Sequence, residues 1–169
     1  MTTLGFIGAS GLMGHGIAKN LLARGHALQL SVHRNRERVA DLLAGGAVEA
    51  ASHAAMAAQC DWVFLCVTGS PQVEAAVLGE HGLLAGARPG GVIVDCSTSE
   101  PDSTARLRER CAAAGVNFVD APLTRTPVEA EAGKLNVMVG AAGHTVKLLN
   151  NFIAQAICTA TAEAFAVGQ

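Results

Sequence analysis

Short apolar runs of β-type sequence alternate with helical stretches along this chain, and this alternation restricts the folds that it can adopt. The first unit is a strand at residues 3–8 followed by a helix at about 12–24. The other predicted strands are 28–33, 61–67, 91–95, 116–120 and 136–140, and the other predicted helices are 36–44 and 101–114. Strands that alternate with helices pair in parallel, and such a sheet is covered on both faces. The sequence therefore predicts a doubly wound α/β fold with a mainly parallel sheet and ligands at the carboxyl ends of its strands.

The composition favours one compact domain that handles small molecules. Half of the 169 residues are apolar, 15% are charged, and the net charge is −2. Lysine and arginine are scattered, so we expect neither nucleic acid nor an anionic membrane as a partner. No apolar stretch reaches about 18 residues and no targeting segment opens the sequence, so we expect a soluble, cytoplasmic protein.

The cysteines and histidines show no spacing typical of a metal site. The five cysteines include no C-x-x-C pair, and each lies in or beside an apolar run, which predicts buried free thiols. The six histidines show no H-E-x-x-H or other ligand pattern, so we expect no metal.

A glycine-rich turn, Gly8-Ala-Ser-Gly-Leu-Met-Gly14, joins the first predicted strand to the first helix. Glycine lets backbone amides approach a pyrophosphate, and the helix N-terminus adds partial positive charge. This position favours a dinucleotide-binding turn of the Rossmann type over a merely structural one. The spacing is G-x-x-G-x-x-G, which looks like the usual fingerprint with one residue inserted around Ser10. The predicted cofactor contacts in the turn are Gly8, Ser10, Gly11, Leu12, Met13 and Gly14.

The end of the second predicted strand bears on the choice of cofactor. A site that prefers NAD normally carries Asp or Glu there to bind the ribose, whereas this chain reads Val32-His-Arg-Asn-Arg36. Arg34 and Arg36 can pair with a 2′-phosphate, with His33 beside them, so we predict NADP as the preferred cofactor, with NAD also accepted. The alternative is that both arginines are solvated residues at the start of a helix.

Two helical segments carry further predictions. Ser99-Glu-Pro-Asp102 combines a capping residue with an early proline and an acidic residue, which predicts a helix from about Pro101. Lys147 and Asn151 lie four residues apart, so a helix would place both on one face, where a lysine can exchange a proton and an amide can orient a substrate. Taken alone, such a pair is more typical of a solvated helix surface.

Seven sequence blocks occur together along the chain, each in order at one of the predicted elements or the loops beside them: Phe6 to Gly14, Ala18-Lys-Asn-Leu21, Asp95-Cys-Ser-Thr98, Asp120-Ala-Pro122, Gly133-Lys-Leu135, Met138-Val-Gly140 and Lys147-Leu-Leu-Asn-Asn151. Together they resemble the β-hydroxyacid dehydrogenase family, in the branch related to 3-hydroxyisobutyrate dehydrogenase. The resemblance covers nearly the whole chain.

The resemblance implies a role for individual residues. Lys147 matches the general acid and base of the family, and Asn151 matches the residue that orients the substrate. The loop Cys96-Ser-Thr98 matches one that meets substrate and nicotinamide, through Ser97 and Thr98, respectively. Val67 and Thr68 match a strand end that contacts the cofactor. Ser97 and Thr98 have an alternative role as caps of the helix that follows.

One loop departs from the family pattern in a way that bears on the substrate. The chain reads Thr124-Arg-Thr126 where the family most often has Ser-Gly-Gly, and this loop looks similar to the sulfolactaldehyde reductase branch. An arginine can hold a carboxylate, phosphate or sulfonate with two hydrogen bonds. We therefore expect Thr124, Arg125 and Thr126 to bind an anionic substrate tail. The alternative is an exposed loop arginine.

The chain also departs from the family next to its predicted catalytic helix. Between the strand at 136–140 and the Lys147 helix the family has another helix and strand, a unit of roughly 30 residues, whereas only Ala141 to Thr145 intervene here. The family continues into a helical domain that completes the substrate pocket and the dimer. We therefore divide the chain into a shortened Rossmann domain at 1–142 and the first part of an interdomain helix at 143–169. The apolar positions of that helix would favour association, and a homo-oligomer is implied for complete family members.

The leading prediction is an NAD(P)-dependent oxidoreductase that transfers a hydride between nicotinamide and a small anionic β-hydroxy acid or its aldehyde acid. The implied substrates are of the 3-hydroxyisobutyrate, tartronate semialdehyde or sulfolactaldehyde type. The alternative is an inactive or fragmentary NADP-binding scaffold without a complete substrate pocket. A short-chain reductase with a Tyr-x-x-x-Lys pair is disfavoured because the chain has no tyrosine.

Overall fold

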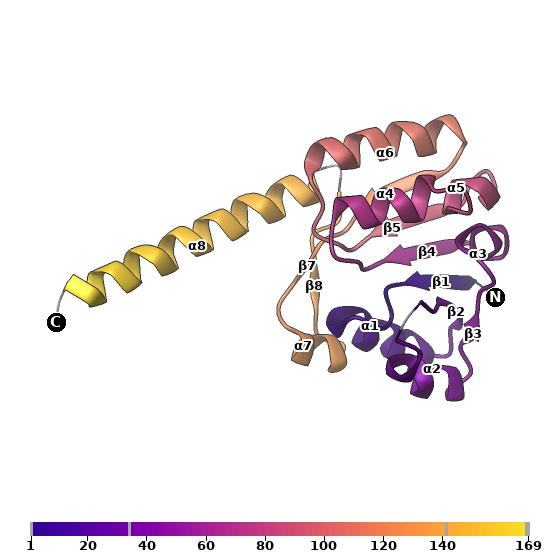
Figure 1. Ribbon diagram of the computed structural model, residues 1–169, viewed down its shortest axis with the longest axis horizontal. Helices are drawn as coiled ribbons and strands as arrows, with labels where there is room; N and C mark the ends of the chain where they lie inside the picture. The colour runs from indigo at the N-terminus through magenta and orange to yellow at the C-terminus, as the bar shows by residue number, and fades with distance from the viewer. Residues whose placement is uncertain (1, 34, 141, 168–169) are drawn as a thin grey trace.

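Six parallel strands form the central sheet (Figure 1). The structure is a computed structural model that describes residues 2–33, 35–140 and 142–167, with side chains through residue 155. The strand order is β3-β2-β1-β4-β5-β6. In chain order the strands are β1 (Thr3–Ile7), β2 (Ala27–Ser31), β3 (Val48–Glu49), β4 (Trp62–Leu65), β5 (Val92–Asp95) and β6 (Asn117–Asp120). The order and the parallel pairing confirm the predicted doubly wound fold.

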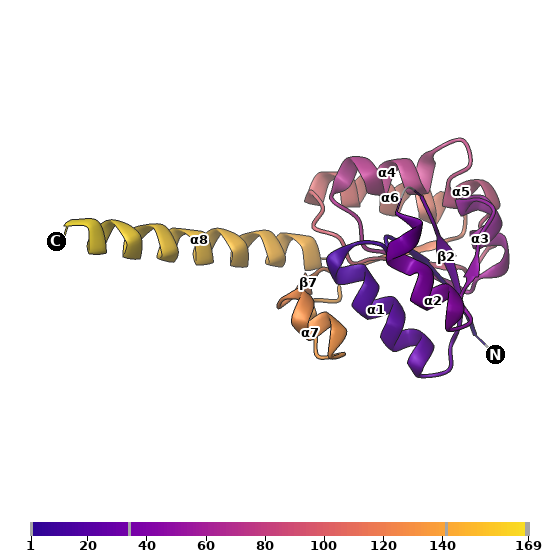
Figure 2. The same ribbon diagram turned by 60° about the horizontal axis from the view of Figure 1, so that its bottom comes forward.

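Helices pack on both faces of this sheet (Figure 1, Figure 2). One face carries α1 (Leu12–Ala23), the 3-10 turn η1 (Arg36–Val39) and α2 (Ala40–Ala44). The other face carries α3 (His53–Gln59), α4 (Ser70–Leu78), α5 (Leu83–Gly86) and α6 (Pro101–Ala113). The sheet therefore separates two layers of hydrophobic core.

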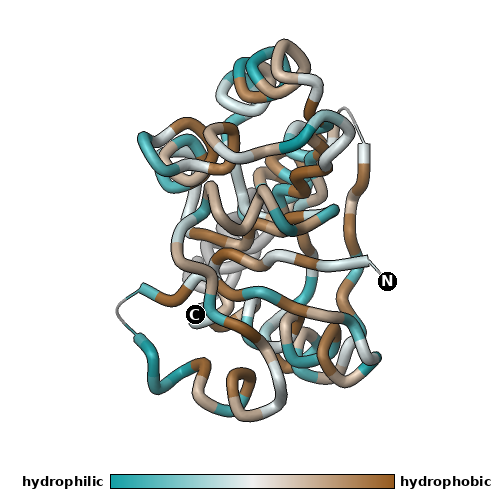
Figure 3. The backbone as a smooth tube through the Cα atoms, turned by 90° about the vertical axis from the view of Figure 1, so that its right-hand side faces the viewer, coloured by the Kyte–Doolittle hydropathy of each residue, from teal (hydrophilic) through white to brown (hydrophobic). Residues whose placement is uncertain are grey.

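Neighbouring residues of a strand enter different core layers. In β1, Phe6 belongs to the core cluster that includes Leu42 of α2, whereas the next residue, Ile7, belongs to the cluster that includes Leu107 of α6. Figure 3 shows hydrophobic residues concentrated along the strands in the middle of the domain. Full burial of one such side chain stabilises the fold by about 1.5–3 kcal/mol, so the apolar runs of the strands contribute most of the stability of the sheet.

Three predicted features differ from the structure. The helix predicted at 36–44 begins as a 3-10 turn, and β2 ends at Ser31. Ser99 does not cap α6: the N-cap is Glu100, and the Ser99 hydroxyl instead donates to Asp95 Oδ2 at 2.8 Å. The sequence does not predict β3 or α3 to α5, because these segments are short and rich in alanine and glycine and therefore carry little periodic signal.

The chain leaves the main sheet after β6. β7 (Leu123–Thr124) and β8 (Asn136–Val137) form a separate antiparallel pair, and α7 (Pro127–Glu131) lies between them in the sequence. α7 packs closely on α1, since a Cβ atom at Gly16 would lie 2.5 Å from the carbonyl carbon of Ala130. The strand predicted at 136–140 is therefore shorter than expected and does not join the main sheet.

The last helix, α8 (Gly143–Val167), extends away from the sheet (Figure 1, Figure 2). It contacts α6. Several of its apolar side chains are exposed, namely Val146, Leu148, Leu149, Phe152 and Ile153. Across residues 2–33, 35–140 and 142–167, none of the helices combines the length and the apolar character needed to cross a membrane.

Candidate cofactor and active site

The three glycines of the turn after β1 differ in their steric surroundings. Gly8 has a φ of 99°, and a Cβ atom there would lie 2.0 Å from the carbonyl oxygen of Cys66. A Cβ atom on Gly14 would lie 2.2 Å from the carbonyl oxygen of Gly8. Folding itself therefore requires glycine at both positions. A Cβ atom on Gly11 would meet only the Gly8 carbonyl oxygen, at 3.2 Å, so the backbone of Gly11 is open to an approaching group.

This turn leads into the N-terminus of α1. Gly11 is the N-cap, Leu12 is exposed, and Ser10 and Met13 are half-buried. Amides of a first helical turn have no partner inside the helix, and together with the helix dipole they attract an anion. A cavity of about 230 Å³ adjoins the turn and is lined by Ser10, Gly11, Leu12, His15, Arg38 and Glu131. The structure thus gathers the predicted turn residues at the carboxyl end of β1.

His15 lies beside the turn and links three helices, a role that the sequence does not reveal. Its Nδ1 atom lies 2.7 Å from Glu131 Oε1, and its Nε2 atom lies 3.1 Å from the carboxylate of Asp41. Lys19 adds a bond of 2.9 Å to the other oxygen of Glu131. The hydrogen bond to Glu131, assisted by Asp41, raises the pKa of His15, and the pKa values of both carboxyl groups are lowered in return.

The arginines near the end of β2 differ in their surroundings. Arg34 lies outside the described residues, and His33 is exposed. The guanidinium of Arg36 is bonded to Glu49 of β3, with Nη1 at 2.7 Å from Oε2. Arg38, which the sequence analysis missed, donates from Nη1 to the carbonyl oxygen of Ser10 at 3.3 Å and so places a cation at the glycine turn. The sequence does contain a signal for Arg38, which is the third arginine in the short run at residues 34–38.

The ends of β4 and β5 are joined to each other. The amide of Val67 donates to Ser97 Oγ at 3.0 Å, and the amide of Ser97 donates to Asp95 Oδ1 at 2.9 Å. Ser97 is buried, whereas Thr68 and Thr98 are exposed at the same edge. The Ser97 hydroxyl therefore accepts from the neighbouring strand end and does not cap α6, although its own proton stays available as a donor.

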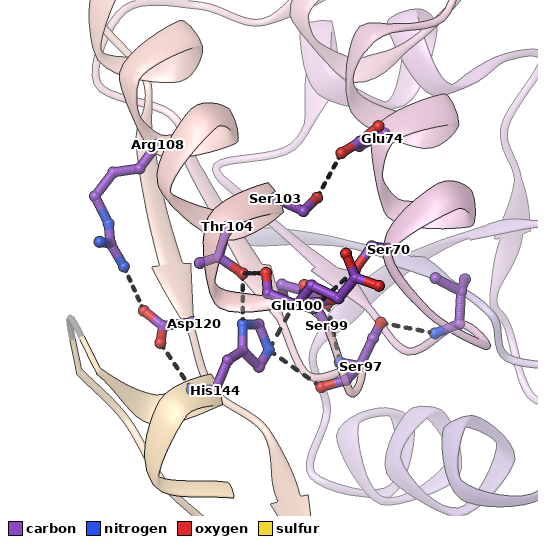
Figure 4. A network of polar contacts seen from close by, with 12 residues as sticks. Ser70, Glu74, Ser97, Ser99, Glu100, Ser103, Thr104, Arg108, Asp120 and His144 are labelled. Atoms are coloured by element: carbon purple, nitrogen blue, oxygen red, sulfur yellow. Dashed lines mark hydrogen bonds and ion pairs between the residues drawn. The ribbon is translucent and has the colours of Figure 1, made fainter. Parts of the chain in front are cut away.

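The start of α8 is attached to this edge through β6. Asp120 is buried at the end of β6, where Oδ1 accepts from Arg108 Nη2 at 2.6 Å and Oδ2 accepts from the amide of His144 at 3.1 Å (Figure 4). Lys147 and Asn151 follow on the same helix and are both half-buried. The structure thus brings the helix that carries the predicted catalytic pair to the carboxyl edge of the sheet.

The loop at residues 124–126 has an unusual backbone. Arg125 has a φ of 79°, and among the non-glycine residues in the described ranges it alone has a positive φ. Its side chain is exposed. Thr126 is the N-cap of α7, and its amide donates to Glu129 Oε2 at 3.0 Å while its hydroxyl contacts the same oxygen. Thr124 is half-buried in β7.

A cavity of about 450 Å³ lies on the α1 side of the sheet. Its lining includes Phe64 of β4, Val94 of β5, Val119 of β6 and Leu135. Trp62 is 45% exposed beside it, although parallel sheets are normally covered on both faces. We interpret this cavity as an incompletely covered part of the sheet, because the glycine turn does not contribute to its lining.

The strand order, the glycine turn and the joined strand ends define a dinucleotide-binding domain of the Rossmann type. Residues 3–163 match the profile of the NAD binding domain of 6-phosphogluconate dehydrogenase. The chain is 32% identical over 194 positions to 2-(hydroxymethyl)glutarate dehydrogenase of Eubacterium barkeri, covering 98% of this chain and 63% of that protein. It is 36% identical over 137 positions to 2-hydroxy-3-oxopropionate reductase of Escherichia coli strain K12, covering 81% and 46%. The chain belongs to the β-hydroxyacid dehydrogenase family.

Solved structures show the same fold. The fold matches Mycobacterium tuberculosis 3-hydroxyisobutyrate dehydrogenase, determined with L-serine, with a TM-score of 0.89 at 24% identity, over 99% of this chain and 65% of that one. It also matches Psf3, determined with NADP+ and 2-OPP, with a TM-score of 0.76 at 30% identity, over 89% and 52%. The chain is also similar in sequence to a protein that is not named as a dehydrogenase. It is 36% identical over 121 positions to the cytokine-like nuclear factor N-PAC of Homo sapiens, covering 72% of this chain and 22% of that protein.

The alignments also bear on the internal gap. The chain spans between 22% and 63% of the length of these curated relatives. The Eubacterium alignment has 194 positions, whereas 98% of 169 residues is about 166, so about 28 positions have no counterpart in this chain. The Escherichia coli alignment has 137 positions, which equals 81% of the chain without such gaps. About 28 missing positions agree in size with the helix and strand expected before α8.

Proposed function

We propose that the chain is the cofactor domain of an NAD(P)-dependent oxidoreductase that transfers a hydride between nicotinamide and a small β-hydroxy acid or its aldehyde acid. The observation that supports this most directly is the glycine turn, where Gly8 and Gly14 shape the backbone and Gly11 leaves it open beside the N-terminus of α1. Residues 1–142 would form this domain, and residues 143–169 would begin a helix that leads to a helical domain.

The described residues fit a dinucleotide that carries a 2′-phosphate. The backbone at Gly8, Ser10, Gly11, Leu12, Met13 and Gly14 would hold the pyrophosphate. No carboxylate follows β2 directly, and Arg38 at the glycine turn offers positive charge to the adenosine phosphate, which favours NADP over NAD. Arg34, which lies outside the described residues, would add to this charge, and Arg36 would have to exchange its bond to Glu49 for the phosphate. Val67, Thr68 and Thr98 would face the nicotinamide end. When bound, the nicotinamide supplies the hydride to the carbonyl carbon or accepts it from the alcohol carbon.

Lys147 is the proposed proton donor and acceptor in this reaction. In reduction, its ammonium would donate a proton to the carbonyl oxygen as the carbon receives the hydride, and in oxidation the neutral amine would take the proton from the alcohol. Asn151, one turn further along α8, would hydrogen-bond the substrate, and the Ser97 hydroxyl would donate to it from the sheet edge. Both groups fix the orientation that hydride transfer needs.

Arg125 is proposed to select an anionic substrate. A left-handed backbone costs a non-glycine residue about 1–2 kcal/mol, so keeping arginine at a φ of 79° indicates that its side chain has a use. A guanidinium at this loop can bind a carboxylate or sulfonate with two hydrogen bonds, with Thr124 and Thr126 beside it. The substrate classes named for the relatives, a hydroxymethylglutarate and a hydroxy-oxopropionate, also carry carboxylates.

A second function is favoured by two observations. About 28 positions of a relative are absent from this chain, and one relative is described as a nuclear factor rather than as a dehydrogenase. Both support a scaffold that binds NADP without completing a substrate pocket.

Turnover distinguishes the two functions. The purified chain would be mixed with NADPH and a panel of short aldehyde acids that end in carboxylate, phosphate or sulfonate, and the loss of NADPH absorbance would be followed. The enzyme proposal predicts turnover that falls by at least about 100-fold in Lys147→Ala, with NADPH affinity kept. NADPH binding without turnover of any member of the panel supports the scaffold instead.

A further inference from the structure

His144 is a buried histidine in the first turn of α8, and the proposed reaction does not use it directly. Its side chain is 1% exposed and lies between the loop after β5 and the first turns of α6 (Figure 4). Nε2 lies 3.2 Å from the carbonyl oxygen of Ser97, and Nδ1 lies 2.8 Å from Thr104 Oγ1. One imidazole therefore contacts two elements that are separate in the sequence.

The contacts of the ring fit one tautomer of the neutral imidazole. With the proton on Nε2, the ring donates to the Ser97 carbonyl oxygen, and Asp95 Oδ2 lies 3.7 Å from the same nitrogen. Nδ1 then accepts the one proton of the Thr104 hydroxyl, which otherwise donates to the carbonyl oxygen of Glu100 at 3.1 Å. With the proton on Nδ1, the lone pair of Nε2 would face the carbonyl oxygen of Ser97 and repel it. The ring thus has a defined orientation between the two elements.

The backbone at the start of α8 is fixed as well. The amide of His144 donates to Asp120 Oδ2, which is itself buried. A Cβ atom on Gly143 would lie 2.5 Å from the carbonyl oxygen of Met138 and 3.0 Å from Asp120 Oδ2. Gly143 therefore lets the chain come close to the end of β6, and His144 enters the space between α6 and the loop after β5.

Lys147 follows three residues later on the same helix, whereas most described side chains beyond it are exposed. The orientation of α8 relative to the sheet edge therefore depends on its first turn. A rotation of roughly 10° about the helix axis moves an atom about 6 Å from that axis by about 1 Å. A displacement of that size can lower a rate by about 100-fold when it separates reacting groups.

We propose that His144 is a positioning residue that joins α8 to α6 and to the loop Cys96–Thr98, and so fixes the place of the Lys147 amine relative to the sheet edge. The catalytic consequence rests on the proposed function of Lys147. The attachment of the helix does not, so it can be tested in the chain whether or not the chain turns over.

The test compares four variants of the network and one control variant with the parent chain. His144→Ala removes both contacts, His144→Gln keeps a donor near Ser97, and His144→Asn keeps an acceptor near Thr104. Thr104→Val removes the hydroxyl with little change of shape and serves if His144→Ala does not fold. His26→Ala changes an exposed histidine outside this network and is the matched control. Three quantities are measured. They are the rates of amide hydrogen exchange, the rate at which an amine-reactive reagent modifies Lys147, and the kcat and the KM for NADPH.

In His144→Ala, exchange should become at least about tenfold faster at residues 145–150 and stay unchanged in the central strands. The labelling rate of Lys147 should change by at least about threefold, and kcat should fall at least about tenfold with the KM for NADPH unchanged. His144→Gln or His144→Asn should recover part of each effect, and His26→Ala should match the parent.

Unchanged exchange and labelling in both His144→Ala and Thr104→Val would overturn the attachment. A locally loosened helix with full kcat would overturn its role in positioning. Faster exchange throughout the domain would show a general loss of stability and would also overturn the proposal. A parent chain without turnover contradicts the enzyme proposal, while exchange and labelling still decide whether His144 holds α8 in place.

Discussion

The backbone amide of Val67 donates a hydrogen bond of 3.0 Å to the hydroxyl oxygen of Ser97. This bond joins the ends of β4 and β5, the two neighbouring strands whose following loops resemble cofactor and substrate contacts of the family. The same serine donates its amide to the buried carboxylate of Asp95. The proposed contacts at Val67 and Ser97 are therefore mechanically linked through one hydroxyl group.

Ser97→Ala tests this link. The change leaves the half-buried amide of Val67 without its acceptor, which should lower the free energy of unfolding by about 1–2 kcal/mol. Chemical denaturation at constant pH measures the loss. Thr98→Ala is the matched control for stability, because this neighbouring side chain is exposed and should change the free energy by less than about 0.5 kcal/mol. Equal stability of the two variants would show that the Val67 bond contributes nothing measurable.

Arg125→Gly should separate stability from substrate binding. Glycine accepts a φ of 79° without strain, so the variant should be more stable by about 1 kcal/mol, while its KM for an anionic aldehyde should rise at least about tenfold. Arg125→Ala keeps the backbone strain and loses the charge, so it should share the rise in KM without the gain in stability. If both variants keep the parent KM, the arginine does not bind the substrate tail.

His15 should make stability depend on pH. Its pKa is raised by Glu131 and Asp41, so its contribution is complete below its ordinary value of about 6.5 and is lost as the pH rises through the higher folded value. The lowered pKa values of Glu131 and Asp41 make their contribution complete above about 4.5, and it is lost as the pH falls through their folded values. The cluster should therefore stabilise most between about pH 4.5 and 6.5.

The measurement is the Tm of the parent chain and of His15→Gln at pH 5.5 and pH 8.5. The Tm difference between parent and variant should be larger at pH 5.5 than at pH 8.5. It should correspond to a difference of about 1 kcal/mol or less in the free energy of unfolding, because these groups are partly solvated. Added salt should reduce the difference. A difference that is the same at both pH values would mean that the charged form of His15 does not stabilise the fold.

The described cysteines should be unreactive in the folded chain. Cys60, Cys96 and Cys111 are buried and Cys66 is half-buried, which confirms the prediction for the first three, while the side chain of Cys158 lies outside those described. Burial raises the pKa values of Cys60, Cys66 and Cys111 to about 11 each and that of Cys96 further. At pH 8 about one thiol in a thousand would then be ionised, so alkylation should be slow.

Mass spectrometry after iodoacetamide treatment checks this site by site. The native chain should show Cys60, Cys66, Cys96 and Cys111 unmodified, whereas the same treatment in guanidinium chloride should modify all of them. Rapid alkylation of Cys96 in the native chain would contradict the burial of this side chain directly after β5.

The fold was largely predictable because its signals are local. The apolar runs that form β1, β4 and β5 and the glycines at residues 8 and 14 stand in the sequence at the positions where the structure uses them. The contacts of His15 and His144 were not predictable, since their partners lie up to 116 residues away. A histidine in a helix gives no local sign that it will meet a carboxylate or a carbonyl group from another element. The backbone of Arg125 likewise follows from the β7 to α7 connection and not from its own residue type.

Titration of the purified chain with NADPH and NADH, read by thermal shift and by fluorescence, tests the central claim most directly. NADPH at about 100 times its Kd should stabilise the parent by about 2.7 kcal/mol, or about 5–10 °C in Tm, and NADH should bind more weakly. Gly11→Ala should keep a Tm close to that of the parent without cofactor, because its added Cβ meets only the Gly8 carbonyl oxygen. It should lose most of the cofactor-induced shift, because the same Cβ stands where the pyrophosphate would approach the backbone. No stabilisation by either cofactor, or an equal shift in Gly11→Ala, would contradict a dinucleotide site at the glycine turn.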